Sequence, residues 1–244
     1  MDQQPIVINK MCELDNYLAQ LNSIETIILF DIDNTLLRTK TNLGSVEWIK
    51  WQERLIQENS QSEYRIANTH EDLKKIYIEW INSSFNQTAL MEVTLPAQIG
   101  EYIKAGFKVV LISSRDNTLM GTTVKQLSEF FNVNDFFSKG LSFENDYWLY
   151  ENGIFLVSGR DKGVCTEFLL MNYKQEFNYQ PINIVFVDDT LTECENVIRH
   201  LHETYNVLSF NYLYGKNYEL EFEKLDKKIV HQEWLEYINK KSIN

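Results

Sequence analysis

The stretch Ile27–Thr35, which reads IILFDIDNT, decides the fold of this 244-residue chain. Its first four residues are apolar and two of them are β-branched, which is typical of a buried β-strand. The carboxylates of Asp31 and Asp33 follow directly, two positions apart. Ligands of open parallel sheets bind beyond the carboxyl ends of the strands. The pair therefore predicts a functional site at a strand end, and the competing interpretation is a solvated turn.

Two further apolar runs, residues 109–112 and 182–187, also stop at polar side chains. These side chains are hydroxyls, a guanidinium and two carboxylates, contributed by Ser113, Ser114, Arg115, Asp188 and Asp189. If the three strands lie side by side and parallel, their ends meet in one pocket that holds four carboxylates. Hard divalent cations, Mg²⁺ above all, prefer such oxygen-rich sites.

A lysine completes this set of candidate residues. Asp161-Lys162-Gly163 opens a stretch whose apolar residues are spaced for one face of a helix. Lys162 can supply the positive charge that compensates a bound anion.

Composition narrows the class of protein. The chain has 35 acidic and 23 basic residues, a net charge of −12, which disfavours nucleic acids and anionic membranes as partners. We find no run of about 20 apolar residues and no signal-peptide pattern at the start, and Cys12, Cys165 and Cys194 lack metal-like spacing. We therefore expect a soluble protein that is made in the cytosol. The oligomeric state does not follow from the sequence.

Strands alternate with helices along the chain, so we expect an α/β fold with a central parallel sheet flanked by helices. We assign residues 1–36 and 96–215 to this core, 37–95 to a helical cap insertion and 216–244 to a helical tail. Within the core, Asn152-Gly153 predicts a β-hairpin in a small insertion at about 141–159. The alternative for 37–95 is a helical decoration away from the site.

Local patterns predict several elements of the core. We expect a short edge strand at 6–8, an amphipathic helix at 11–21 and a helix at 97–105 before the strand 107–112. The sequence Thr190-Leu191-Thr192-Glu193 has the form of a capping box, in which Thr190 and Glu193 would close the start of a helix.

Together the motifs resemble the haloacid dehalogenase (HAD) superfamily over roughly residues 24–210. Asp31-Ile32-Asp33-Asn34-Thr35 is similar to its first motif, Asp-x-Asp-x-Thr, and Ser113 to its second. Lys162 resembles the third motif and Asp188-Asp189 the fourth. The resemblance implies a Rossmann-like HAD core.

The resemblance also implies a role for each matching residue. Asp31 would be the nucleophile that forms an aspartyl-phosphate, and Asp33 the acid and base that serves the leaving oxygen and then water. Ser113 and the backbone N–H of Ser114 would bind phosphate oxygens. Lys162 would neutralise the phosphate charge.

For the cofactor, the resemblance implies Mg²⁺. Its ligands would be the Asp31 carboxylate, the Asp33 backbone carbonyl and the carboxylates of Asp188 and Asp189, one of these last two directly and the other through water. Arg115 either holds the substrate or forms a structural salt bridge.

Asp33 separates the branches of the superfamily. Dehalogenase members lack this second aspartate, and P-type ATPases usually carry Lys-Thr after the nucleophile, so the resemblance favours a phosphatase. Its substrate would be a small phosphorylated metabolite or a phosphotyrosyl protein. The alternative is a catalytically quiet HAD-like binding or effector module.

The segment Leu43–Trp48, with Asn152-Gly153-Ile154 and Lys162-Gly163, is also similar to a HAD group of bacteria that live inside host cells. Effectors of such bacteria include a phosphotyrosine phosphatase, which implies a possible translocation into a host cell. In the expected cap, Trp48 and Trp51 either stack against the leaving group of the substrate or form the core of the cap itself.

Overall fold

The computed structural model describes residues 3–241 and divides the chain into two compact units. The first unit comprises residues 1–36 and 90–215, and the second comprises 37–89 and 216–244. The cap and the tail that the sequence analysis treated separately thus fall in one unit.

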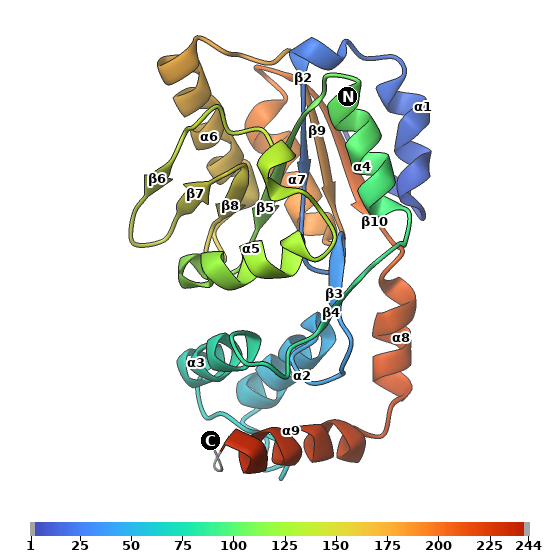
Figure 1. The fold of residues 1–244 in the computed structure, drawn as a ribbon. Helices are drawn as coiled ribbons and strands as arrows, with labels where there is room; N and C mark the ends of the chain where they lie inside the picture. Colours follow the sequence, from blue (N-terminus) through green and yellow to red (C-terminus); the bar gives the residue numbers. More distant parts are fainter. Residues whose placement is uncertain (1–2, 242–244) are drawn as a thin grey trace. The chain divides into compact units, whose positions relative to one another are not determined.

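The first unit is built on an eight-stranded sheet with the strand order β1-β10-β9-β2-β5-β8-β7-β6 (Figure 1). The first six strands of this order are parallel, and β7 and β6 are antiparallel to their neighbours. The strands are β1 Ile6–Ile8, β2 Thr26–Phe30, β5 Lys108–Ser113, β6 Phe143–Glu144, β7 Leu149–Glu151, β8 Ile154–Leu156, β9 Asn183–Asp188 and β10 Asn206–Tyr212. The expected α/β fold with a parallel central sheet is confirmed.

The helices of this unit alternate with its strands. They are α1 Asp15–Leu18, α4 Leu95–Lys104, α5 Met120–Ser128, α6 Lys162–Phe177 and α7 Leu191–Leu201. Short 3-10 turns lie at Met11–Leu14, Ser23–Glu25, Asn117–Leu119 and Val133–Asp135. The amphipathic helix expected at 11–21 is shorter and mixed, because the chain forms a 3-10 helix at Met11–Leu14 and one α-helical turn at Asp15–Leu18.

The order of the strands places a topological switch point between β2 and β9. From β2 the chain moves to β5 on one side, and from β9 it moves to β10 on the other. Since such crossovers are right-handed, the helices that follow the two strands cover opposite faces of the sheet. Ligands of open α/β sheets bind beyond the carboxyl ends of the strands at such a switch point, which here are the ends of β2 and β9.

The core of the sheet is apolar, and every residue of β2 is buried. The Asn152-Gly153 turn joins β7 to β8, as the sequence predicted, with both residues at positive φ (51° and 76°). However, β8 pairs with β5 in parallel, so the hairpin extends the central sheet. This extension carries the turn between β6 and β7 to the same edge as the end of β5.

The second unit is mainly helical. It contains α2 Val46–Gln57, α3 His70–Ile81, α8 Lys216–Lys224 and α9 Lys227–Lys241, with the two-stranded sheet of β3 Leu37–Thr39 and β4 Thr88–Leu90. The tail joins the insertion through Glu233, which accepts hydrogen bonds from the backbone of Leu43 at 2.7 Å and the side chain of Asn42 at 3.1 Å. Gly44 is at φ +74°, where an added Cβ would lie 2.2 Å from the ring of Trp80.

In the described part of the chain, we find no helix that is both long enough and apolar enough to cross a bilayer.

Candidate functional site

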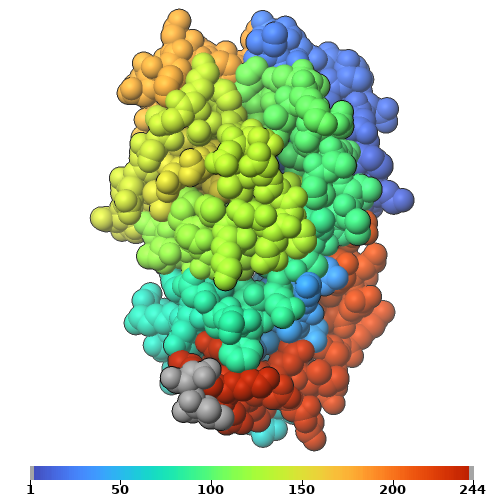
Figure 2. Space-filling view, viewed as in Figure 1, coloured from blue at the N-terminus to red at the C-terminus, as the bar shows by residue number. Residues whose placement is uncertain are grey.

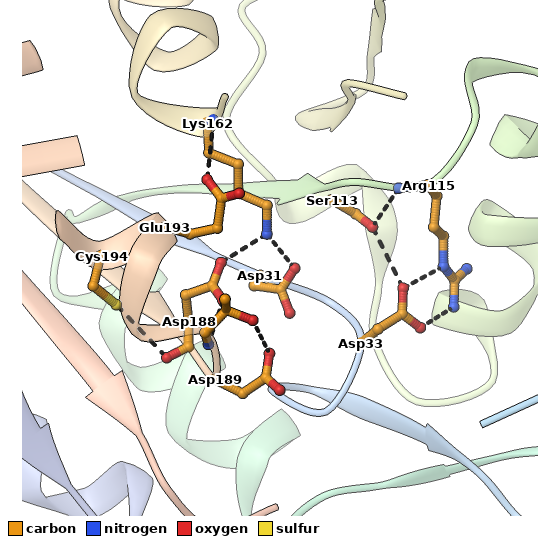
Figure 3. Close-up of polar contacts among 10 residues, drawn as sticks. Asp31, Asp33, Ser113, Arg115, Lys162, Asp188, Asp189, Glu193 and Cys194 are labelled. Atoms are coloured by element: carbon orange, nitrogen blue, oxygen red, sulfur yellow. Dashed lines mark hydrogen bonds and ion pairs between the residues drawn. The ribbon is translucent and has the colours of Figure 1, made fainter. Parts of the chain in front are cut away.

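The carboxyl ends of β2, β5 and β9 bring most of the predicted residues together (Figure 3). Asp31 directly follows β2, and its N–H donates to the Val187 carbonyl on β9 at 2.9 Å. Ser113 is the last residue of β5, and Asp188 is the last residue of β9. The pairing of the three strands fixes these side chains at one edge of the sheet.

A buried ion-pair network joins these strand ends to α6. The Lys162 ammonium lies 2.5 Å from Asp31 Oδ1 and 2.7 Å from Asp188 Oδ2, and all three residues are buried. Burial by itself lowers the pKa of Lys162, but the charges of Asp188 and Asp31 outweigh burial and hold that pKa above its ordinary value. Lys162 is therefore a permanent cation at neutral pH.

The start of α6 is anchored so that Lys162 reaches the network. Asp161 caps the helix, since its Oδ1 accepts from the N–H of Gly163 at 2.8 Å and of Val164 at 3.2 Å. Glu193 of α7 accepts from the Lys162 N–H at 3.2 Å. The predicted capping box is wrong, because the Thr190 side chain makes no cap hydrogen bond to α7 and Glu193 instead serves the neighbouring helix.

Three carboxylates lie close together at this network, and Lys162 pairs with two of them. Asp31, Asp188 and Asp189 each offer one oxygen within 4.8 Å of the others, and one oxygen of Asp31, Oδ2, is buried with no hydrogen-bond partner in the described residues. Burial raises the pKa of Asp31 well above its ordinary range; Lys162 opposes this, and Asp188 and Asp189 add to it. Among the described residues, the cluster thus contains one buried carboxylate oxygen without a hydrogen-bond partner.

A hard divalent cation fits this arrangement. Mg²⁺ takes carboxylate oxygens, and an unpartnered buried oxygen beside two further carboxylates is the donor set that it needs. The Asp33 carboxylate does not belong to this cluster. Its expected contribution through the backbone carbonyl stays a prediction.

The Asp33 carboxylate points to a second cation. Arg115 Nε and Nη2 each lie 2.8 Å from one oxygen of Asp33, a two-point ion pair. The Nη1 of Arg115 donates to Thr123 Oγ1 at 3.0 Å and to Gln126 Oε1 at 2.7 Å. The structure thus places Arg115 in a salt bridge that α5 supports.

Ser113 lies between the two ion pairs. Its hydroxyl accepts from the Arg115 N–H at 3.2 Å and donates to Asp33 Oδ2 at 3.4 Å. Ser114 is exposed beside it, and its carbonyl accepts from the Gly159 N–H at 2.9 Å. Both serines therefore lie at the same edge as the aspartates.

Trp48 and Trp51 lie in the second unit, on α2. Trp48 is buried there, and Trp51 contacts the rings of Tyr64 and Phe222 with centroid separations of 6.3 Å and 6.1 Å. Both side chains pack within their own unit.

The sequence did not single out Thr123, Gln126 or Glu193 as supports of the site. Thr123 and Gln126 could have been noticed, because these polar residues interrupt the otherwise apolar face of the helix that becomes α5. Glu193 gave no such signal, since its partner is 31 residues away in the chain.

The chain matches one family model over almost its whole length. The model is described as "Protein of unknown function (DUF2608)" and covers residues 7–243. No curated protein matches the chain. A matching solved structure is the HAD domain of the effector protein Lem4 from Legionella pneumophila, an inactive mutant, at 14% identity and a TM-score of 0.37 over 87% of this chain and 99% of that chain.

Proposed function

We propose that this chain, which belongs to the DUF2608 family, is a Mg²⁺-dependent phosphomonoester phosphatase. It would have a HAD-like core and act through an aspartyl-phosphate intermediate. The observation that carries the proposal is the Oδ2 of Asp31, which has no hydrogen-bond partner among the described residues and lies beside Lys162 in a cluster of three carboxylates at the switch point of the sheet.

In the first step we assign the nucleophile to Asp31. A carboxylate oxygen of Asp31 attacks phosphorus, and the bond from phosphorus to the leaving oxygen breaks. Lys162, held 2.5 Å from Asp31, neutralises the approaching phosphate. Asp31, Asp188 and Asp189 would hold Mg²⁺, which when bound supplies further charge neutralisation.

Asp33 moves the protons. It gives one to the leaving oxygen, so that the alcohol or phenol departs neutral. Water then attacks the aspartyl-phosphate, its proton passes to Asp33, and inorganic phosphate leaves Asp31 free again. Because Arg115 engages both oxygens of Asp33, at least one of these hydrogen bonds must open when the substrate enters. Ser113 and Ser114 orient the phosphate oxygens.

The experiment is phosphate release from a generic aryl phosphate, with added Mg²⁺ and with a chelator. We expect turnover that requires the metal and that Asp31→Asn lowers by at least about a thousandfold. The matched control is Asp135→Asn, which changes an exposed aspartate in the turn before Phe137, beyond the amino end of β5. Turnover that is insensitive to chelation contradicts the metal assignment, and full activity of Asp31→Asn contradicts the nucleophile assignment.

A binding module without turnover is the second candidate function. The two-point hold of Arg115 on Asp33 favours it, because a carboxylate engaged at both oxygens is not free to move protons. This candidate predicts no hydrolysis of any phosphate ester and unchanged ligand binding in Asp31→Asn.

Within the phosphatase proposal, the substrate is a small phosphorylated metabolite or a phosphotyrosyl protein. A role as an effector in a host cell is an expectation of the resemblance alone. A panel that compares phosphopeptides with sugar and nucleotide phosphates distinguishes the substrate classes.

A further inference from the structure

The edge of the sheet that carries the candidate site continues past Ser113. Ser113 pairs with Leu156 at the end of β8, and Leu156 pairs with Leu149 at the start of β7. The turn 145–148 between β6 and β7 therefore lies at the same edge as Asp31. Adjacent strands are about 4.8 Å apart, so about 10 Å separates β2 from β8 and about 14 Å separates β2 from β7.

The loop after β8 is fixed to the loop after β5. The N–H groups of Val157, Ser158 and Gly159 donate to the carbonyls of Ser113, Arg115 and Ser114, at 2.9, 3.0 and 2.9 Å. Ser158 is at φ +48°, a conformation that is costly for a residue other than glycine. Its hydroxyl accepts from the Asn117 N–H at 3.0 Å. The chain is thus held in a tight turn immediately before Arg160.

This turn presents Arg160 against the ring of Tyr147. The guanidinium carbon lies 4.0 Å from the ring centroid, which is a close cation–π contact. Both residues are exposed, and Arg160 forms no ion pair with any described carboxylate. A guanidinium that lies flat on a ring still offers its N–H edges to a carboxylate or phosphate.

Arg160 differs in this respect from the two cations of the site. Lys162 and Arg115 both pair with aspartates. The carboxylate next to Arg160 in the chain, Asp161, instead pairs with Arg199 at 3.0 Å and caps the start of α6. The yellow-green to gold part of the chain, which includes the turn 145–148, lies on the surface in Figure 2. Arg160 is therefore available to a ligand at the edge.

We infer that Arg160 and Tyr147 form a second anion subsite for the leaving part of the substrate. The subsite takes one carboxylate or phosphate about 10 to 14 Å from the reacting phosphorus. The acidic residues Glu144 and Asp146 shortly precede Tyr147 in the chain, which favours a single anion over a polyanion. The inference rests on the proposed function, because it needs the reacting phosphate to lie at Asp31.

The experiment uses two pairs of phosphotyrosyl peptides, and the members of a pair differ only in a glutamate or a glutamine three residues from the phosphotyrosine, about 10 Å away in an extended chain. Glutamate is placed before it in one pair and after it in another. We expect kcat/KM to favour a glutamate peptide by about fivefold, the upper end for an exposed ion pair, mainly through KM. An alkyl bisphosphate of the same span, compared with its monophosphate, tests a small-molecule source of the anion.

Arg160→Gln should reduce the preference to about onefold, and Arg160→Lys should keep part of it, since the charge remains but the planar fork is lost. Tyr147→Phe, which keeps the ring, should keep the preference, whereas Tyr147→Ala should weaken it. Lys104→Gln removes a positive charge from the end of α4, at the opposite edge of the sheet, and serves as the charge control.

Two results overturn the subsite. One is a wild type that shows no preference within either pair of peptides or for the bisphosphate, and the other is a preference that survives in Arg160→Gln. If no substrate turns over, the proposed function fails, and the affinity ratio of labelled glutamate and glutamine peptides for Asp31→Asn then decides the subsite. An Arg160-dependent ratio supports the subsite, and equal affinities overturn it.

Discussion

Asp31 and Asp33 are two residues apart, and each forms an ion pair with a buried cation, but the two pairs differ in what they leave unsatisfied. Lys162 serves Asp31 and Asp188 together, with Asp189 nearby, and Asp31 Oδ2 has no hydrogen-bond partner in the described residues. Arg115 engages both oxygens of Asp33 and uses its remaining nitrogen on α5.

The difference separates a reactive position from a supported one. In the described residues, Lys162 pairs with Asp31 and Asp188 but leaves Asp31 Oδ2 without a hydrogen bond, so this oxygen gains free energy from a bound cation or from a reaction that uses it. The Asp33 pair joins one carboxylate to one guanidinium, and all three nitrogens of that guanidinium form hydrogen bonds. Substitutions at the two pairs should therefore have different effects.

Among substitutions at the two buried cations and their supports, the largest effect should come from Lys162→Met. It removes the ammonium that pairs with both Asp31 and Asp188, so we expect kcat/KM to fall by at least about a hundredfold. Without metal the free energy of unfolding should also fall, by about 3 kcal/mol, because buried carboxylates lose their partner. Urea unfolding and phosphate release measure the two effects, and Lys104→Met is the exposed control. Wild-type activity would contradict the role of the lysine.

Arg115→Met should cost stability in a different way. It leaves Asp33, Thr123 and Gln126 without their shared hydrogen-bond donor. We expect the free energy of unfolding to fall by about 3 kcal/mol. This is the low end for a broken buried ion pair, because the Asp33 side chain is partly exposed. Added Mg²⁺ should not restore this loss. The double variant Arg115→Met/Asp33→Asn should recover part of it in a double-mutant cycle, and strictly additive effects would contradict the pairing.

Mg²⁺ should stabilise the cluster around Asp31 specifically. At a free concentration one hundred times its dissociation constant, a bound ion adds about 2.7 kcal/mol to the free energy of unfolding. We expect this gain in the wild type and its loss in Asp31→Asn and Asp188→Asn, with Asp135→Asn as the control. The assignment of the metal ligands fails if the ion stabilises all four proteins equally.

The pH dependence of stability should also reveal Asp31. Since burial raises its pKa in the folded protein, the folded state binds the proton more tightly than the unfolded state. The contribution is favourable below the ordinary value near 4 and is lost as the pH rises toward the folded pKa, by up to about 1.4 kcal/mol per pH unit. Metal-free wild type should therefore lose stability relative to Asp31→Asn as the pH rises above about 4, and parallel curves would contradict this.

The parts of the fold that follow from short-range patterns could be predicted from the sequence. Apolar runs that end in Asp31, Ser113 and Asp188 located the three strands, and Asn152-Gly153 located a turn. The same patterns do not say which strand a hairpin joins, because the pairing of β8 with β5 depends on contacts far apart in the chain.

The partners of the site residues were harder to predict for the same reason. The sequence left open whether Arg115 binds the substrate or forms a salt bridge. Arg115 and Asp33 are far apart in the chain, and only the pairing of β2 with β5 brings them together. Glu193 satisfied a local capping pattern, yet its carboxylate accepts from Lys162 on another helix. The tail could not be assigned because Glu233 contacts Leu43, 190 residues earlier.

The smallest effect should come from Gln126→Leu. It removes one of several acceptors around Arg115 and keeps the ion pair to Asp33, so we expect the free energy of unfolding to fall by about 1 kcal/mol and turnover by only a few-fold. A loss as large as that of Arg115→Met would mean that the support from α5, and not the ion pair, holds Asp33.

The comparison of Asp31 with Asp33 is tested most directly by locating the phosphoryl group during turnover. The protein is mixed with an aryl phosphate and Mg²⁺, quenched in acid within the first turnover, and its peptides are analysed by mass spectrometry. The account predicts a phosphoryl adduct on Asp31 that disappears in Asp31→Asn and in the presence of a chelator. An adduct on Asp33, or undiminished phosphate release by Asp31→Asn, would contradict it.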